Sequence, residues 1–402
     1  MTERVSVAVD IDGTTHPAGT LHVTTRRTLT STFAYQSDYI EGPDGYALDP
    51  QLPLREGATG TAGLPGAFSD AAPDRWGRNL IRKRITQTGG LGGREITELD
   101  YLLGVSDATR QGAVRFARSA EGPFLAEHTD VPQLVALPRL LRAAEAVARD
   151  DDGWEEVKAL LDAGTGSLGG ARPKASVAEG EHLAIAKFPH PADEWDVMAW
   201  EATALDLAHR CGVDVPVRRV VRVGGRTALV LRRFDRTGVE RVGYLSAMSL
   251  LSAQDGDSRD YLEVAEALAE GAASARSDLA QLWRRVAFSI AINNTDDHLR
   301  NHGFLRDRAG WRLAPAFDIN PNPHRARRAT SILGAVDRED CRDALIEAAP
   351  AFGLGRDTAN QILSEVSRGV ADWAAVARSH GVRASEVTLM AYAFGESEQH
   401  AG

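Results

Sequence analysis

A short polar segment, TDDHLRN at 295–301, gathers side chains that could do chemistry. Asp296 and Asn301 have the spacing Asp-x-x-x-x-Asn, which can place a carboxylate base and a Mg²⁺-binding amide in one loop for phosphoryl transfer. His298, two residues after Asp296, is the second candidate catalytic residue. Apolar residues before this segment repeat at helical spacing, so we expect it to follow the end of a helix.

A further carboxylate follows within a few residues. Two apolar stretches, 303–305 and 311–314, predict a small hairpin, and Asp318 comes soon after it in the sequence PAFD. Mg²⁺ prefers hard oxygen ligands, and phosphoryl transfer needs a second such ligand beside Asn301. Asp318 is therefore the second candidate Mg²⁺ ligand.

A glycine-rich segment, GTGSLG at 164–169, satisfies the pattern G-x-G-x-x-G, which is a weak signal by itself. Pro173 comes too soon for the helix of a dinucleotide-binding fold, and Gly170 stands where a Walker A motif has lysine. Two strand-like runs follow instead, and the second ends at Lys187. A glycine loop followed by a strand lysine is typical of protein kinases, which bind the ATP phosphates with both. The loop residues that we expect to contact ATP are Ser167, Leu168, Gly169 and Gly170.

Lysine is rare in this chain. Of 46 Lys and Arg residues, the lysines are Lys83, Lys158, Lys174 and Lys187. A lysine kept in such a composition is a candidate for a role that needs a compact ammonium rather than a planar guanidinium. Two of the four follow the glycine-rich segment closely.

An ATP-binding lysine needs a carboxylate that orients it. Glu201 lies on the helix predicted at 195–210 and is the candidate for this role beside Lys187. Glu194, Asp196 and Asp206 are competitors on or beside the same helix.

The polar segment also allows a transition-metal hydrolase. His298 and His302 are four residues apart, and neighbouring aspartates could complete the ligand set. This alternative leaves the glycine-rich segment and Lys187 without a role. A capped helix end with solvated acids explains one cluster, but not three clusters in the order found in kinases.

Composition limits the class of protein. The 402 residues predict two to three domains, and a net charge of −10 argues against a protein that coats nucleic acid. Cys211 and Cys341 lack the spacing of a disulfide framework or a thiolate zinc site. No apolar run is long enough to span a membrane, and the first residues lack a signal peptide, so we expect a cytoplasmic protein without membrane partners.

Several stretches of the chain together resemble the HipA family of bacterial serine/threonine kinases, the toxin halves of HipA–HipB toxin–antitoxin pairs. In the core of the chain the resemblance is carried by SLGGARPK at 167–174, AKFP at 186–189, LVLRRFDR at 229–236, TDDHLRN at 295–301 and PAFD at 315–318. FSDAAPD at 68–74 and DYLLG at 100–104 resemble the family's small first domain.

The resemblance implies an α+β, two-lobed, protein-kinase-like fold. It implies a small α/β N-terminal domain at 1–120, a sheet-containing nucleotide-binding lobe at 121–235 and an all-helical catalytic lobe at 236–402. Asp296 would be the catalytic base, and Phe234 would belong to the hinge that contacts adenine. Ser167 matches the loop serine that family members autophosphorylate. A phosphate there would place negative charge where ATP phosphates bind, so self-inhibition would follow.

The resulting hypothesis is an ATP- and Mg²⁺-dependent serine/threonine protein kinase that acts as a toxin. The resemblance implies a HipB-like helix-turn-helix antitoxin, DNA binding only through that antitoxin, and a protein substrate such as an aminoacyl-tRNA synthetase. Two alternatives stay open: a small-molecule kinase of the same fold, and a mainly non-catalytic co-repressor that acts with a DNA-binding antitoxin.

Overall fold

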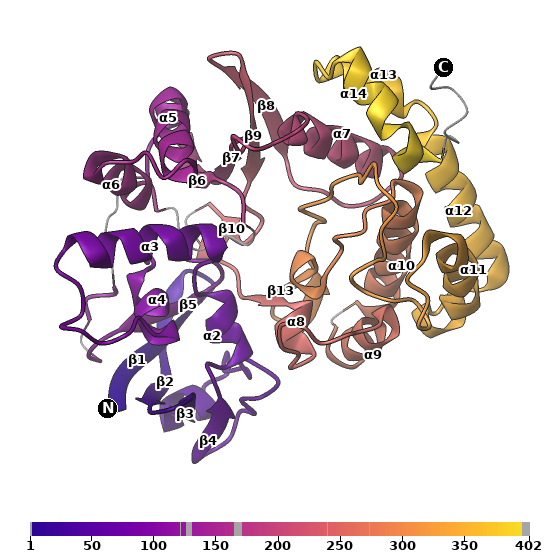
Figure 1. The fold of residues 1–402 in the computed structure, drawn as a ribbon. Coiled ribbons are helices and arrows are strands. Elements are labelled where there is room, and N and C mark those ends of the chain that lie inside the picture. The colour runs from indigo at the N-terminus through magenta and orange to yellow at the C-terminus, as the bar shows by residue number, and fades with distance from the viewer. Residues whose placement is uncertain are drawn as a thin grey trace. The chain divides into compact units, whose positions relative to one another are not determined.

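The computed structural model describes residues 2–120, 122–125, 131–164, 171–238, 240–272 and 274–395. The chain divides into two compact units. The first comprises Met1–Ala192, Val223–Arg226 and Val230–Ser252, and the second comprises Asp193–Arg222, Thr227–Leu229 and Ala253–Gly402. Both units contain helices and strands (Figure 1). The predicted ATP-contacting residues of the glycine loop, Ser167, Leu168, Gly169 and Gly170, lie outside the described residues.

The first unit opens with a five-stranded antiparallel sheet in the order β4-β3-β2-β1-β5. Its strands are β1 (Thr2–Ile11), β2 (Thr14–Thr25), β3 (Leu29–Tyr35), β4 (Ala58–Ala62) and β5 (Val114–Ala117). Along β1, the side chains of Val5, Val7 and Val9 alternate onto one face, and each is at most 2% exposed. This alternation is the pattern of a sheet with one face in the core.

Short helices complete this part of the chain. They are α1 (Ser37–Glu41), α2 (Gly66–Asp70), α3 (Arg75–Gln87) and α4 (Glu98–Gly104). Apolar residues at roughly helical spacing run from 67 to 84, and the structure divides that stretch into α2 and α3. Pro73 lies between them, and a proline removes a helical hydrogen bond and disfavours helix in the residue before it. Asp74 then caps α3, because its carboxylate accepts a 2.6 Å hydrogen bond from the Gly77 amide.

The stretch 134–162 forms η1 (Leu134–Ala136), α5 (Leu137–Ala148) and α6 (Trp154–Asp162), with the acidic sequence DDDG at 150–153 between the two α-helices. A four-stranded sheet follows in the order β6-β7-β9-β8. Its strands are β6 (Lys174–Glu179), β7 (His182–Lys187), β8 (Arg218–Val223) and β9 (Arg226–Arg232). Short elements complete the first unit: β10 (Arg236–Thr237), β11 (Glu240–Arg241), β12 (Tyr244–Ser246) and α8 (Ala247–Leu250).

The second unit is mainly helical (Figure 1). Its helices are α7 (Val197–Arg210), α9 (Tyr261–Gly271), α10 (Ala275–Ala291), α11 (Arg338–Ala348), α12 (Arg356–Val370), α13 (Trp373–Ser379) and α14 (Ala384–Met390), with 3₁₀ turns η2 (Leu299–Asn301), η3 (Ala349–Phe352) and η4 (Ala391–Phe394). The hairpin predicted after the polar segment forms as β13 (Gly303–Arg306) and β14 (Trp311–Leu313). The prediction of an all-helical lobe at 236–402 is therefore wrong in this detail, because these two strands pair within it.

Aromatic clusters mark the core of each unit. In the first unit, Phe68 meets Phe33 and Phe116 edge to face, with ring centroids 5.4 and 5.3 Å away. In the second unit, the rings of Trp373 and Phe394 stack at 4.3 Å. Edge-to-face and stacked pairs add to the free energy gained from burying the rings.

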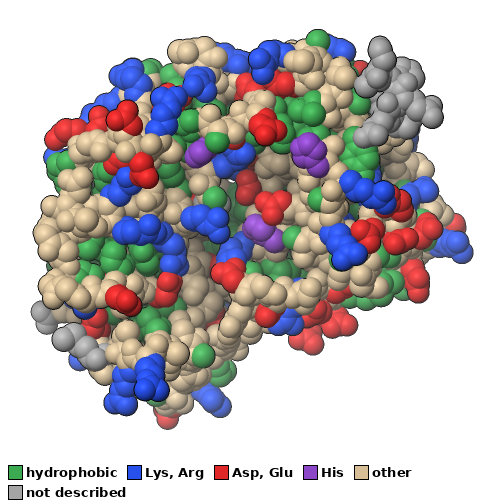
Figure 2. All heavy atoms as spheres, viewed as in Figure 1, with side chains coloured by type: hydrophobic (Ala, Val, Ile, Leu, Met, Phe, Trp, Pro, Cys, Tyr) green, Lys and Arg blue, Asp and Glu red, His purple; other side chains and the backbone are tan. Residues whose placement is uncertain are grey.

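Among the described residues, no helix is both long and apolar enough to cross a membrane. On the face that Figure 2 draws, Lys and Arg side chains are interspersed with Asp and Glu side chains.

Replacing Phe68 by Ala tests the first core. Its ring is fully buried, so we expect the free energy of unfolding to fall by about 3–5 kcal/mol through lost burial and a cavity. Urea unfolding followed by circular dichroism measures this change. Val135→Ala is the control, because that side chain is 87% exposed and its loss should cost less than about 0.5 kcal/mol. Equal losses in the two variants would contradict the described core.

Candidate functional site

The polar segment follows the end of α10, as its apolar spacing predicted. Asn293 has a left-handed backbone with φ of 51°, a conformation that asparagine tolerates because its side chain hydrogen-bonds locally. Its Nδ2 donates to the carbonyl oxygens of Asn322 and His324 at 2.7 and 3.0 Å. The Nδ2 of Asn322 in turn donates to Thr295 Oγ1 at 2.7 Å. The loop after α10 is thereby joined to the segment that follows Asp318.

Asp296 and Asn301 lie in one closed loop. The Nδ2 of Asn301 donates to the Asp296 carbonyl oxygen at 3.0 Å, and the His298 amide donates to the same oxygen at 2.9 Å. Asn301 is 6% exposed, whereas Asp296 is exposed. Because an amide is planar, this bond turns the oxygen of the Asn301 side chain to the opposite side. The five-residue spacing thus brings the Asn301 side chain to the backbone of Asp296.

Asp297, the next residue, points into the protein. Its Oδ2 accepts hydrogen bonds from Tyr261 Oη at 2.6 Å and Ser289 Oγ at 2.7 Å. Its Oδ1 lies 3.0 Å from His302 Nε2, and Arg328 Nη2 lies 3.4 Å from Oδ2.

The electrostatics of Asp297 follow from these partners. Burial by itself would raise the pKa of the carboxyl, but the imidazole of His302, the guanidinium of Arg328 and the Tyr261 hydroxyl hold that pKa well below its usual range. The carboxylate therefore stays ionised inside the protein. It fixes the loop while leaving Asp296 at the surface.

The structure does not support the alternative of a transition-metal site. His302 is fully buried, and its ring meets Tyr261 edge to face at 5.4 Å. The described residues contain no group of three or more His, Cys, Asp or Glu side chains arranged to hold a metal ion. The buried Nδ1 of His298 has no hydrogen-bond partner within the described part of the chain. His302 thus positions Asp297 rather than binding a metal.

Asp318 stands close enough to influence Asp296. The pKa of Asp296 is raised, first because the surrounding protein removes part of its water; His298 opposes this rise, and the charges of Asp318 and Asp297 add to it. Asp318 has a left-handed backbone with φ of 57°, and the buried Oδ1 of Asn320 has no hydrogen-bond partner among the described residues. Neighbouring carboxylates and an unsatisfied amide oxygen are the donors that suit Mg²⁺, so these residues fit a cation.

Lys187 is the last residue of β7 and is 7% exposed. In the antiparallel register it stands directly opposite Lys174 on β6, which is 3% exposed. The first unit thus holds two buried lysines side by side, and they are the two that follow the glycine-rich segment.

The residues that compete to orient Lys187 differ in their surroundings. Glu201 is 1% exposed on α7. Asp196 caps α7 by accepting from the Ala199 amide, Asp206 accepts from Arg218, and Glu194 is exposed. Glu201 is therefore the buried acid among the four, and its pairing with Lys187 stays a prediction.

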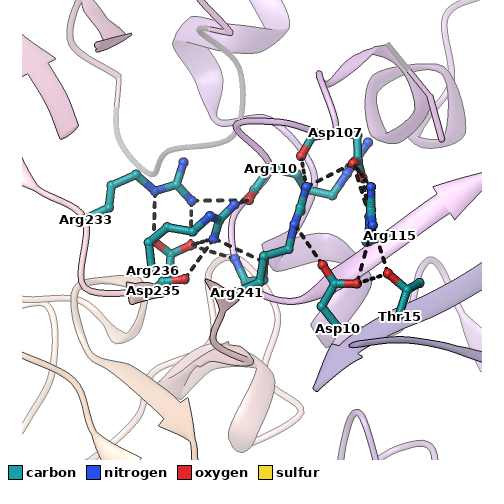
Figure 3. A network of polar contacts seen from close by, with 10 residues as sticks. Asp10, Thr15, Asp107, Arg110, Arg115, Arg233, Asp235, Arg236 and Arg241 are labelled. Atoms are coloured by element: carbon teal, nitrogen blue, oxygen red, sulfur yellow. Dashed lines mark hydrogen bonds and ion pairs between the residues drawn. The ribbon is translucent and has the colours of Figure 1, made fainter. Parts of the chain in front are cut away.

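The predicted hinge is anchored by buried charges on either side of Phe234. Phe234 itself is half-buried, with its ring centroid 6.4 Å from that of Tyr244. Asp235 accepts hydrogen bonds from Arg233, Arg236 and the Gly112 amide (Figure 3). Burial alone would raise the Asp235 pKa, but the two guanidinium groups hold that pKa well below its usual range.

Sequence reasoning missed the partners of Asp297. Tyr261, Ser289 and Arg328 belong to no motif, and each reaches the carboxylate from a separate part of the chain. Arg328 lies in a run with Arg325 and Arg327, which pair at the surface with Glu339 and Asp337. Nothing in the spacing of that run distinguishes its one buried arginine.

Replacing Asp297 by Asn tests the buried anchor. We expect the free energy of unfolding to fall by about 3–5 kcal/mol at pH 7, because the variant leaves buried cationic partners without their charge. The folded-state pKa is depressed, so the wild-type advantage is present above the unfolded pKa of about 4. It should shrink by about 1.4 kcal/mol for each pH unit below that value. Urea unfolding of both proteins between pH 7 and pH 3 measures the difference, and a difference that grows on acidification would contradict the assignment.

The fold and the sequence both match known proteins. The family model of the HipA N-terminal domain matches residues 9–117, and the model of the HipA-like C-terminal domain matches residues 166–374. Two curated proteins of Sinorhizobium fredii, Y4dM and Y4mE, are 27% and 24% identical over 30% and 34% of this chain. Their names assign them provisionally to the kinases, and the matched part of this chain spans about a third of the length of each, 32% and 33%.

A solved structure matches nearly the whole chain. It is a complex of the Shewanella oneidensis MR-1 toxin–antitoxin proteins HipA and HipB with operator DNA. The match covers 97% of this chain and 95% of the other, with a TM-score of 0.71 and 17% identity. This likeness confirms the predicted α+β, two-lobed fold class. With one family model covering more than half of its residues, the chain belongs to the HipA family.

Proposed function

We propose that the protein is an ATP- and Mg²⁺-dependent serine/threonine protein kinase that acts as the toxin of a toxin–antitoxin pair. One observation carries the proposal. The loop at 295–301 closes on itself through Asn301 and the Asp296 carbonyl, while the neighbouring Asp297 is fixed in the interior. This arrangement presents the Asp296 carboxylate at the surface beside a second acid, Asp318.

In this function, Asp296 is the catalytic base. A hydroxyl oxygen of the acceptor attacks the γ-phosphorus of ATP, the bond from that phosphorus to ADP breaks, and the hydroxyl proton passes to the Asp296 carboxylate. The raised pKa of Asp296 suits this task, because a carboxylate with a raised pKa accepts a proton more readily near neutral pH. The closed loop keeps the carboxylate oriented.

Asn301 and Asp318 would hold Mg²⁺, and the Oδ1 of Asn320, two residues after Asp318, would add a further oxygen. When bound, the ion supplies positive charge that stabilises the phosphate oxygens. We assign Lys187 to binding of the phosphates that are not transferred, and Phe234 to the adenine side of the nucleotide. Ser167 is the proposed site of autophosphorylation, with self-inhibition as its consequence.

The proposed partner is a helix-turn-helix antitoxin. Family membership supports this assignment, together with the likeness to a protein whose solved structure contains HipB and operator DNA. DNA would then be bound through the antitoxin rather than by this chain.

Incubation of the purified protein with labelled ATP and Mg²⁺ tests the chemistry. We expect a single phosphate that maps to Ser167, seen by intact mass and peptide mapping. Asp296→Asn should abolish this transfer by removing the base, while ATP binding remains largely intact. Ser167→Ala should remove the acceptor.

Asp307→Asn is the matched control for loss of one carboxylate. Asp307 is exposed in the β13–β14 turn, outside the proposed machinery, so this variant should transfer phosphate normally. Normal transfer by Asp296→Asn would refute the catalytic assignment. A wild-type protein that binds ATP without labelling itself would favour a small-molecule acceptor or the co-repressor alternative.

The toxin role makes a separate prediction. Induced expression in a bacterial host should arrest growth with the wild-type protein but not with Asp296→Asn, because arrest needs phosphoryl transfer. Co-expression of a helix-turn-helix protein encoded beside this gene should restore growth, as measured by culture density. Equal arrest by both proteins would show that toxicity is independent of the kinase reaction.

A further inference from the structure

We propose that Arg285 is a positioning residue that sets the place of Asp318 through the Ala314 carbonyl, and thereby the strength of Mg²⁺ binding. The inference rests on the proposed kinase function, in which Asp318 is a Mg²⁺ ligand. It assigns a role to a helix residue that belongs to none of the motifs of the site. Every residue in the argument belongs to the second unit.

Arg285 is a cation buried inside the second unit. It lies on α10 and is 4% exposed, and its Nη2 donates to the Ala314 carbonyl at 2.6 Å. Its Nε and Nη1 have no hydrogen-bond partner among the described residues. Burial lowers the pKa of the guanidinium to about 10, and the charges of Asp297 and Asp214 act against this fall. Arg285 is therefore still protonated at pH 7.

Packing does not explain an arginine at this position. An apolar side chain of similar length, such as methionine, would fill the space without burying a charge. A buried guanidinium whose donors are only partly satisfied lowers the free energy of unfolding. What the guanidinium does supply is the hydrogen bond to Ala314, the residue that precedes Pro315 and the rest of the PAFD segment ending at Asp318.

Arg285 and Ser289 are four residues apart on α10, so they are neighbours on one face of the helix, separated by about 6 Å along its axis. Ser289 Oγ donates to the Asp297 carboxylate at 2.7 Å, while Arg285 holds the Ala314 carbonyl. One turn of a rigid helix therefore relates the loop that contains Asp297 to the segment that ends at Asp318.

The segment before Asp318 has two further backbone supports. The Ala314 amide donates to the Gly303 carbonyl at 2.8 Å, and the Ala316 amide donates to the Asp214 carbonyl at 2.7 Å. The bond from the arginine is the one of these three that comes from α10. Without it we expect the segment to stay folded but to shift relative to the helix, and the carboxylate of Asp318 to shift with it.

The test is nucleotide binding by Arg285→Met in the full chain. Titration calorimetry with a non-hydrolysable ATP analogue gives one Kd in EDTA and another in saturating Mg²⁺. We expect the Kd in EDTA to stay unchanged and the Kd in Mg²⁺ to rise about tenfold, the effect of one hydrogen bond from a charged donor. A residue that only stabilises the fold would leave both values unchanged.

The pattern of the two Kd values also separates positioning from a simple effect of charge. The metal-free nucleotide carries more negative charge than its Mg²⁺ complex. If Arg285 acted only as a nearby positive charge, its loss would therefore weaken the metal-free nucleotide at least as much as the complex. Positioning predicts weaker binding of the complex alone. Arg285→Lys, which keeps the charge and one donor for Ala314, should recover most of the affinity in Mg²⁺.

Arg284→Met is the matched control, because it makes the same change one residue earlier on α10. The side chain of Arg284 pairs with Glu365 at 2.7 Å and donates to the Cys211 carbonyl, away from the segment before Asp318. This variant should leave the Kd in EDTA and the Kd in Mg²⁺ unchanged.

The outcomes distinguish this inference from the proposed function. A wild-type Kd for Arg285→Met in Mg²⁺, or an equal loss in EDTA and in Mg²⁺, would overturn the positioning role and leave the kinase assignment intact. If Arg285→Met does not fold, Arg285→Gln decides, since its shorter side chain cannot make the same bond and should also weaken the Mg²⁺ complex alone. A wild-type protein that binds no ATP analogue would overturn the proposed function, and this inference with it.

Discussion

The buried carboxylate of Asp297 is the interaction on which the candidate site depends. Its partners are Tyr261 of α9, Ser289 of α10, His302 between η2 and β13, and Arg328, so one charge joins the loop to four parts of the chain. A lone ionised carboxylate in the interior would be prohibitively unfavourable, and this one persists because each oxygen has donors. Because the side chain of Asp297 points into the protein, the side chain of its neighbour Asp296 points toward solvent.

Two adjacent aspartates therefore have opposite electrostatic environments. Cationic and hydroxyl partners hold the Asp297 pKa below its usual range, whereas partial loss of water and nearby negative charge raise that of Asp296. One residue type thus supplies an ion that stays fixed and a base that can take up a proton. The chemistry of each is decided by its surroundings rather than by the motif that contains both.

The sequence predicted much of the fold because apolar spacing reports which face of an element is buried. In α9 and α12 the buried apolar residues recur at helical spacing, and the hairpin predicted after Asn301 is present. The helical spacing at 67–84 continues across Pro73, where the structure has two separate helices, α2 and α3. The sequence predicted Asp296, Asn301 and Asp318 as site residues, because they follow one another along the chain in the order found in kinases. It could not find Tyr261 or Arg328, because contacts between distant residues leave no trace in local spacing.

The scarcity of lysine has a chemical consequence beyond the nucleotide site. Lys174 and Lys187 are buried, and Lys83 is held between Asp150 and Asp152, which leaves Lys158 as the exposed lysine of the four. Reactive acyl groups of metabolism modify amines, whereas guanidinium groups stay protonated and resist them. Because nearly all the surface cations of this protein are arginines, its charge pattern is insensitive to the acylation state of the cell.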